Sequence, residues 1–175
     1  MIQEAVNIQR KWTICRYNNR DEYEQGIIPE SIVDGKGNVL PGKSEFKGNV
    51  LLNEGINNVL TQVLAGLSSP TVYDEANASL GVGTDGTTSE SASQSGLQGG
   101  TTTHKGMSSG YPSASSQTIT WQSEFGGTEG SHDWKEFTVV NGADDTGDNL
   151  NRKVSDQGSK ADGQTWTLTL EITFS

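Results

Sequence analysis

The two histidines are the residues of this chain whose surroundings come closest to a catalytic arrangement. His132 is next to Asp133 and close to Glu129, whereas His104 lies in a stretch rich in Ser, Thr and Gly. A carboxylate beside an imidazole can orient a general base, so a catalytic His132 is one hypothesis. However, no Gly-x-Ser-x-Gly nucleophile motif accompanies it. We favour a histidine in a turn or an interface, predict that the protein is not an enzyme, and assign no catalytic residue.

Two further segments have the residue types of an ion site or a phosphate site. Asp144, Asp145 and Asp148 form an acidic turn whose oxygens suit Ca²⁺, but the helix-loop-helix pattern and its bidentate Glu are absent, which favours a solvated loop. Residues 81–86 are glycine-rich but lack the Gly-Lys-Ser/Thr ending of a phosphate loop, which favours a tight turn at a strand end. Because Cys15 is the single cysteine, we expect a small buried residue there and predict no metal and no cofactor.

Composition and charge exclude several classes of protein. The chain has 175 residues, of which 31% are hydrophobic and 22 are glycine, and its formal charge is -10. A net negative charge disfavours nucleic acid as a partner, because phosphates are neutralised by Lys and Arg. No apolar run approaches the roughly 20 residues of a membrane span, and the first residues lack the pattern of a secretion signal. We therefore expect synthesis in the cytoplasm, with no membrane partner.

The N-terminal zone, residues 1–46, has a mixed character. Residues 11–17 are rich in β-branched and aromatic types and predict a strand, and a polar run follows at residues 18–25. Gly- and Pro-containing turns then divide the chain up to residue 46. Because this zone contains little from which to build a core, we predict an arm or hairpin that packs on a main domain of residues 47–175 or on a neighbour.

One amphipathic helix is predicted near residues 54–65. The apolar positions follow the i, i+3, i+4, i+7, i+8 spacing of a single helical face. They are Ile56, Val59, Leu60, Val63 and Leu64. Asn53 suits the N-cap and Gly66 suits the C-terminal end. We expect this apolar face to pack into the core.

The chain from about residue 73 onward predicts β-structure. Apolar and polar residues alternate over residues 166–174, which is the period of a half-buried strand, and residues 117–121 and 135–140 are further candidates. The stretch 83–112 is of low complexity and predicts a long surface loop. Together these patterns predict a mainly β fold, an antiparallel β-sandwich or barrel-like domain with one amphipathic helix and an N-terminal arm or hairpin.

A series of short phrases occurs in a fixed order along the chain. They lie at residues 46–57, 76–84, 105–112, 125–130, 134–137, 150–154, 158–160 and 164–168, together with Trp121. In this order they resemble small virion proteins of tailed bacteriophages, including phages of cyanobacteria. The resemblance covers about three quarters of the chain. Gly130 stands where Ala is common in that family and Ser159 where Thr is common, and the N-terminal zone is less typical.

The resemblance implies a structural role in the virion and no catalytic residues. The function that we expect is a capsid decoration (cement) protein on the capsid exterior, which binds the major capsid protein and stabilises the shell. We expect a homotrimer, because a subunit on a local threefold axis sums many modest contacts. The alternatives are a tail, baseplate or head-tail connector component, and a host-glycan-binding module suggested by polar loops and tryptophans.

Aromatic and basic side chains are the candidate interface residues. Aromatic residues dominate interface energetics, so we predict contacts with the shell or a neighbour at Trp12, Tyr17 and Tyr23. Arg152 and Lys153 could pair with carboxylates of a neighbour, and the alternative is a solvent-facing basic pair. The remaining tryptophans, Trp121, Trp134 and Trp166, are predicted to lie in the core.

Overall fold

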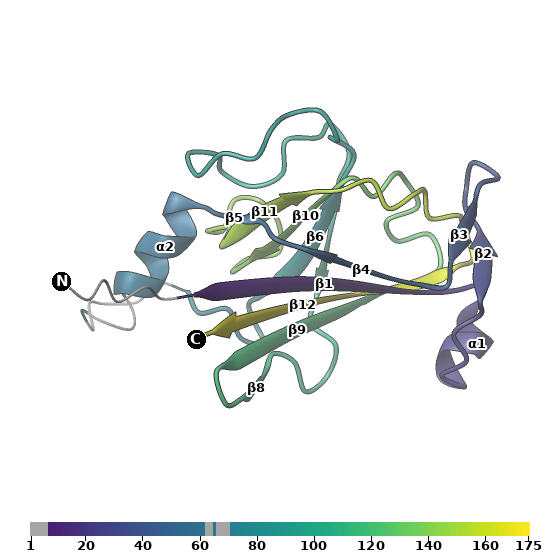
Figure 1. Ribbon diagram of the computed structural model, residues 1–175, viewed down its shortest axis with the longest axis horizontal. Helices are drawn as coiled ribbons and strands as arrows, with labels where there is room; N and C mark the ends of the chain where they lie inside the picture. Colours follow the sequence, from purple (N-terminus) through teal and green to yellow (C-terminus); the bar gives the residue numbers. More distant parts are fainter. Residues whose placement is uncertain (1–6, 62–64, 66–70) are drawn as a thin grey trace.

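Two antiparallel sheets pack face to face in the computed structural model, which describes residues 7–61, 65 and 71–175 (Figure 1). The first sheet has the strand order β4-β1-β12-β9-β8 and the second the order β5-β11-β10-β6-β7. The first is built from β1 (Ile8–Tyr17), β4 (Lys43–Lys47), β8 (Ser113–Ser115), β9 (Thr118–Phe125) and β12 (Thr165–Phe174). The second is built from β5 (Val50–Leu51), β6 (Ser79–Gly83), β7 (Thr102–Gly106), β10 (Glu136–Val140) and β11 (Asn151–Val154). The predicted β-rich antiparallel fold is confirmed.

The core lies between the two sheets and follows the alternation in the sequence. Every second residue of β12 from Trp166 to Ile172 is at most 2% exposed. β9 contributes Trp121 and Phe125 from the same sheet, and Phe137 faces them from β10. Since successive strand residues point to opposite faces, one alternating stripe on each strand is enough to fill the interior. The predicted core positions of Trp121, Trp134 and Trp166 are confirmed.

The predicted boundary at residue 46 does not separate an arm from a main domain. All ten residues of β1 pair with β12, from Ile8 opposite Phe174 to Tyr17 opposite Thr165, and β4 covers the other edge of β1. β1 therefore lies inside the first sheet. Its pairing partner is the C-terminal strand, and local composition contains no information about a contact so distant in sequence.

A helix and a hairpin lie at one end of the sandwich, at the right of Figure 1. α1 (Arg20–Glu24) occupies the predicted polar run, and the Asn19 side chain caps it by accepting from the Glu22 N–H. β2 (Ser31–Val33) and β3 (Val39–Pro41) form the hairpin. Among residues 7–46 of the predicted N-terminal zone, α1, this hairpin and the connecting segments lie outside the two sheets, so the prediction of an added hairpin describes this part alone.

The stretch 83–112 is more ordered than a surface loop. It contains β7, which pairs with all five residues of β6, and Leu97 is 8% exposed. Gly81 and Gly83 lie within β6 rather than in a turn. A Cβ on Gly83 would come within 2.4 Å of the Glu136 carboxylate, so glycine here admits a buried side chain from the neighbouring strand.

Helix α2 (Asn53–Val59) confirms the predicted helix in type, but its buried face is different. The buried residues of α2 are Gly55 and Asn58. A Cβ at Gly55 would lie 2.4 Å from the Leu150 Cα, so the glycine allows the helix to approach the chain closely there. Leu52 occupies the N-cap position in place of Asn53, without a side-chain cap. Val63, Leu64 and Gly66 lie outside the described residues.

No helix among the described residues is long and apolar enough to span a membrane.

Candidate docking groove

The two sheets differ in strand length, and this difference leaves part of one sheet without a partner sheet. β1 and β12 have ten residues each, whereas β6 and β10 have five. At about 3.3 Å per residue, the long strands reach roughly 33 Å and the short ones roughly 17 Å. The free ends of β1, β12 and β9 lie beside α2, at the end opposite the hairpin (Figure 1).

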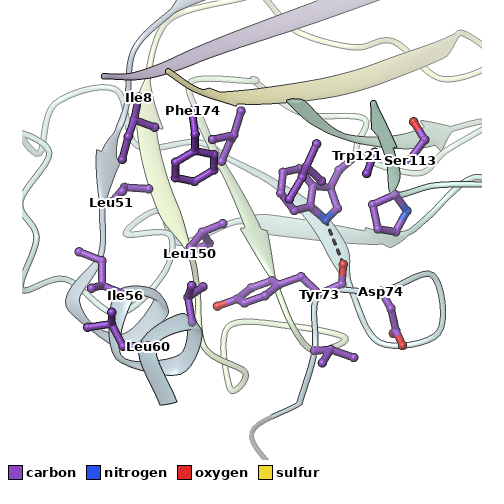
Figure 2. Close-up of a pocket in the computed structure, with 16 residues that line it drawn as sticks. Ile8, Leu51, Ile56, Leu60, Tyr73, Asp74, Ser113, Trp121, Leu150 and Phe174 are labelled. Carbon is purple, nitrogen blue, oxygen red and sulfur yellow. Dashed lines mark hydrogen bonds between the residues drawn. The ribbon is translucent and has the colours of Figure 1, made fainter. Parts of the chain in front are cut away.

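An apolar groove of about 780 Å³ occupies this end of the sandwich. In Figure 2, Ile8 and Phe174 face it from the first sheet, Ile56 and Leu60 from α2, and Leu150 lies between them. The full lining comprises Ile8, Leu51, Ile56, Val59, Leu60, Val72, Tyr73, Asp74, Pro112, Ser113, Ala114, Ile119, Trp121, Leu150, Ile172 and Phe174. This volume lies within the range of ligand and segment pockets, about 300–1,000 Å³.

The apolar stripe of α2 forms one wall of the groove instead of entering the core. Its exposed fractions are 36% at Ile56, 37% at Val59 and 46% at Leu60. Gly55 and Asn58 occupy the helix face that contacts residues 148–150, just before β11, and residues one position further along lie about 100° around the helix. The Asn58 amide donates to Asp148 at 2.7 Å, which fixes this orientation. The prediction that the stripe packs into the core is therefore wrong.

The opposite wall ends in another exposed apolar side chain. Phe174 is 43% exposed at the end of β12, although it continues the alternation that buries Ile172. Val72, also in the lining, is 44% exposed. Single exposed apolar side chains are ordinary, but a contiguous set around a hollow is typical of a binding surface.

The polar groups at the far side of the groove are hydrogen-bonded within the fold. The Trp121 Nε1–H donates to the Tyr73 carbonyl at 3.1 Å, and the Tyr73 hydroxyl donates to the Asp148 carbonyl at 2.9 Å (Figure 2 shows the first bond). Burial raises the pKa of Tyr73 well above its ordinary value, so the hydroxyl remains a donor. Asp74 accepts from the backbone N–H and the side chain of Asn77. These hydrogen bonds hold the three side chains in place, and their polar atoms are therefore already engaged and offer little to an occupant of the groove.

Two of the predicted interface residues, Trp12 and Arg152, have no exposed surface. Trp12 is 0% exposed; its ring stacks on Phe46 with centroids 6.2 Å apart and packs at a tilt against Phe137 with centroids 5.7 Å apart. Arg152 is also 0% exposed and pairs with Glu136 at 2.8 Å. Neither side chain can reach a neighbour, because the second sheet covers β1 and Arg152 satisfies a buried carboxylate. The predictions of contacts at Trp12 and Arg152 are therefore wrong.

The other three predicted interface residues have partners inside the chain. Tyr17 and Tyr23 pack edge to face with ring centroids 5.4 Å apart, and Tyr17 is 7% exposed. Lys153 lies 3.2 Å from Glu90. The structure does not bring these residues to the groove, and an intermolecular contact at Tyr23 or Lys153 stays a prediction.

The candidate catalytic residues are used in structural contacts. His132 Nε2 lies 2.9 Å from the Thr103 hydroxyl and Nδ1 lies 2.9 Å from the Asp133 carbonyl, so its ring contacts no carboxylate. The Asp133 carboxylate binds Lys36 and Lys135 instead. Both nitrogens of a potential general base are thus occupied by neighbours.

The acidic turn does not converge on one point. The Asp144 carboxylate accepts from Thr146, Asp145 lies 3.2 Å from His104 Nε2, and Asp148 accepts from Asn58. No group of three or more potential metal ligands is found within residues 7–61, 65 and 71–175. Cys15 is half-buried, and burial raises the pKa of its thiol.

All four tryptophans are at most 4% exposed, so none provides a stacking surface for a sugar. Of the residues that do form an open surface, Phe174 was assigned to a strand and the α2 stripe to the core by their periodicity, whereas Ile8 fell in the predicted N-terminal zone. The available signal was Gly55 with Asn58, three residues apart on one helix face. A glycine and an amide at that spacing favour a close approach of the helix backbone to the neighbouring chain on that face. The apolar stripe then lies on a different side of the helix.

No protein-family model, curated protein or solved structure matches this chain.

Proposed function

We propose that this chain is a non-enzymatic structural protein of a tailed-phage virion, a capsid decoration protein that binds the outer face of the shell through its apolar groove. The observation that carries the proposal is the groove itself, whose wall side chains Leu60, Val72 and Phe174 are each more than two-fifths exposed. Covering such side chains gains roughly 25 cal/mol per Å² of apolar area, so a partner at this end stabilises both molecules. The resemblance of the ordered phrases to small virion proteins supports the same role.

The polar groups of the fold support an assembly role over a catalytic one. The imidazole nitrogens of His132 and the carboxylate of Asp133 are engaged in separate internal contacts. A general base must reach a substrate proton, and the groove offers apolar walls at the place where a substrate would sit. Association as a homotrimer around a local threefold axis, with the major capsid protein as partner, is part of this proposal.

A tail, baseplate or connector subunit is the second candidate, and an exposed pair at the hairpin end favours it. Val33 and Val39 are cross-strand partners in the β2–β3 hairpin and are 56% and 72% exposed. Ile27 is 55% exposed on the preceding segment. A subunit with apolar surfaces at opposite ends suits head-to-tail rings or stacks, which are heterologous assemblies.

Copy number per particle tests the proposal and separates the two candidates. Quantitative mass spectrometry of purified particles gives the ratio of this chain to the major capsid protein. A ratio near one is expected for a protein that covers the shell, and particles that lack the chain should then release DNA at a lower temperature. A ratio of a few per cent favours the tail candidate, and absence from intact particles overturns a virion role.

A further inference from the structure

The character of the groove restricts what can occupy it. The walls are aliphatic and aromatic side chains, and Trp121, Tyr73 and Asp74 direct their polar groups to partners within the fold. A small polar ligand is held by a few convergent polar groups, and these three are already engaged. The groove lies between α2 and the first sheet, and its wall side chains Leu60, Val72 and Phe174 are each more than two-fifths exposed, which suits a continuous apolar segment of a protein.

The charges around the groove restrict the occupant further. Asp74 is the one charged residue among the described lining residues, and Glu75 follows it at an exposed position. Glu54 lies in the first turn of α2. A lysine or arginine is absent from the described lining, and the chain carries a formal charge of -10. Electrostatic complementarity therefore favours positive charge on the partner.

The same charges argue against a second copy of this chain as the occupant. Two copies carry the same excess of carboxylates, and their mutual repulsion opposes close contact at an acidic rim. A basic partner instead gains from both the apolar walls and the rim. Long-range attraction also increases the rate of encounter, most strongly at low salt.

We infer that the groove binds an apolar segment of a partner protein in which Lys or Arg residues flank the apolar side chains. This inference deepens the proposed function and rests on it, since it specifies the chemistry of the shell segment to which the chain docks. The apolar side chains of the segment cover Ile8, Phe174 and the α2 stripe, and its cations lie beside Asp74 and Glu75. The partner is another protein, not a second copy.

Two synthetic peptides of about 18 residues test the inference with the full chain in solution. Both place the same leucine face on an amphipathic helix, and the polar face is Lys in one and Glu in the other. Fluorescence anisotropy should give dissociation constants about tenfold or more lower for the Lys peptide. Raising the salt from about 0.05 to about 0.5 M should narrow the difference, because the Debye length becomes shorter.

Two matched variants locate the binding site. Leu60→Asp introduces a carboxylate into the groove wall at a position that is 46% exposed, so the fold should persist and Lys-peptide binding should weaken about tenfold. Val39→Asp introduces the same charge at the opposite end, at a position that is 72% exposed, and should leave binding unchanged. Circular dichroism of both variants checks that the β fold is retained.

Four outcomes overturn the inference. They are equal affinity for the two peptides, no binding of either peptide, equal loss of binding in Leu60→Asp and Val39→Asp, and a wild-type dimer that Leu60→Asp converts to monomers. The last result assigns the groove to a second copy. Because the peptide assay uses no particles, its failure leaves the copy-number measurement intact, and the two proposals fail separately.

Discussion

Besides Arg152, two other cations lie almost wholly inside the fold, Arg16 and Lys160. The Arg16 guanidinium lies 4.8 Å from the centre of the Trp166 ring and donates to the Gln157 carbonyl. Lys160 is 2% exposed and donates from Nζ to the Gly127 carbonyl at 2.8 Å. Burial lowers the pKa of Arg16 to about 10 and that of Lys160 to about 8. Of the two, Lys160 loses its proton within an accessible range of pH.

We expect Lys160 to make the free energy of unfolding rise with pH between about 8 and about 10.4, the latter being the pKa of an unperturbed lysine. In that window the unfolded chain still binds the Lys160 proton and the folded chain does not, so increasing pH favours folding. Below pH 8 both states hold the proton. The rise should be on the order of 1–3 kcal/mol. Urea unfolding of the wild-type protein and Lys160→Met at several pH values measures it.

The comparison with Lys160→Met is needed because other groups titrate in the same window with the opposite sign. Burial raises the pKa of Cys15, Tyr17 and Tyr23, so these groups make the free energy of unfolding fall as the pH rises. Their contributions cancel in the difference between the two proteins. Lys160→Arg keeps the charge without titrating and should lack the rise as well. Equal pH dependence in wild type and Lys160→Met contradicts the prediction.

At the scale of elements, one buried carboxylate ties the segment 84–101 to the second sheet. Glu136 on β10 is 0% exposed and accepts from the backbone N–H groups of Gln98 and Gly99 at 2.9 and 2.7 Å. Arg152 on β11 neutralises it at 2.8 Å and also pairs with Asp85. A segment rich in Ser, Thr and Gly has little apolar area to bury, so hydrogen bonds to this carboxylate hold it in place.

We expect Glu136→Gln to destabilise the fold by about 3–5 kcal/mol, because the buried Arg152 charge loses its shorter ion pair and keeps only the longer one with Asp85. The amide protons of Gln98 and Gly99 should exchange with solvent much faster than in the wild type. Hydrogen exchange read by NMR measures both effects. Lys11→Met removes an exposed ion pair with Glu171 and should cost at most about 1 kcal/mol. Unchanged protection at Gln98 and Gly99 in Glu136→Gln contradicts the proposed role of the carboxylate.

The strands were the elements that the sequence predicted best. Alternation located β9 and β12, because each buries one face against the core over much of its length and therefore repeats with period two. β10 was also a candidate strand, although all five of its residues are buried. The placement of β1 could not be predicted in this way. Its ten pairings with β12 join residues more than 140 positions apart, and no local pattern specifies such a register. β7 was missed since Thr and Gly in its sequence resemble the flanking low-complexity segment.

The groove could not be predicted from sequence, although each of its walls had a signal. The apolar period of α2 identified a helix with an apolar face, but whether that face is buried depends on which side of the helix contacts the chain before β11. Contact is made at Gly55 and Asn58, whose residue types carry no hydrophobic signal. The hollow also depends on a difference between strand lengths in two sheets, and this difference becomes evident once the strands are paired. Binding surfaces of this kind arise from assembly of elements and not from any one element.

At the scale of the whole molecule, carboxylates hold the hairpin end to the sandwich. Asp34 accepts from the N–H groups of Lys36 and Asn38 within the hairpin and from Ser159 on the chain between β11 and β12. The Asp133 carboxylate, which lies outside the hairpin, forms an ion pair with Lys36. The apolar pair Val33 and Val39 faces solvent at this end. Loss of these charges at low pH should therefore loosen the hairpin end first.

We expect the free energy of unfolding to fall as the pH is lowered through the acid range, with Asp34 as one identifiable contributor. Burial raises the pKa of Asp34, but hydrogen bonds from Asn38, Lys36 and Ser159 lower it more, so the net pKa lies below its ordinary value. The contribution of Asp34 is complete above the unfolded pKa of about 3.9 and is lost as the pH falls through the lower folded pKa. Asp34→Asn should cost about 1–3 kcal/mol near neutral pH.

Urea unfolding of Asp34→Asn and the wild type from about pH 7 to about pH 2 tests this assignment, since the folded pKa lies below the unfolded value of about 3.9. The difference between the two proteins should shrink at the acid end, because a protonated Asp34 has lost the advantage of its charge. Glu54→Gln provides a control of opposite sign: burial raises the pKa of Glu54, so its protonation favours the folded state as the pH falls. A constant difference for Asp34→Asn across the range means that its hydrogen bonds act independently of charge, and the acid sensitivity of the hairpin end must then come from Asp133 and Lys36.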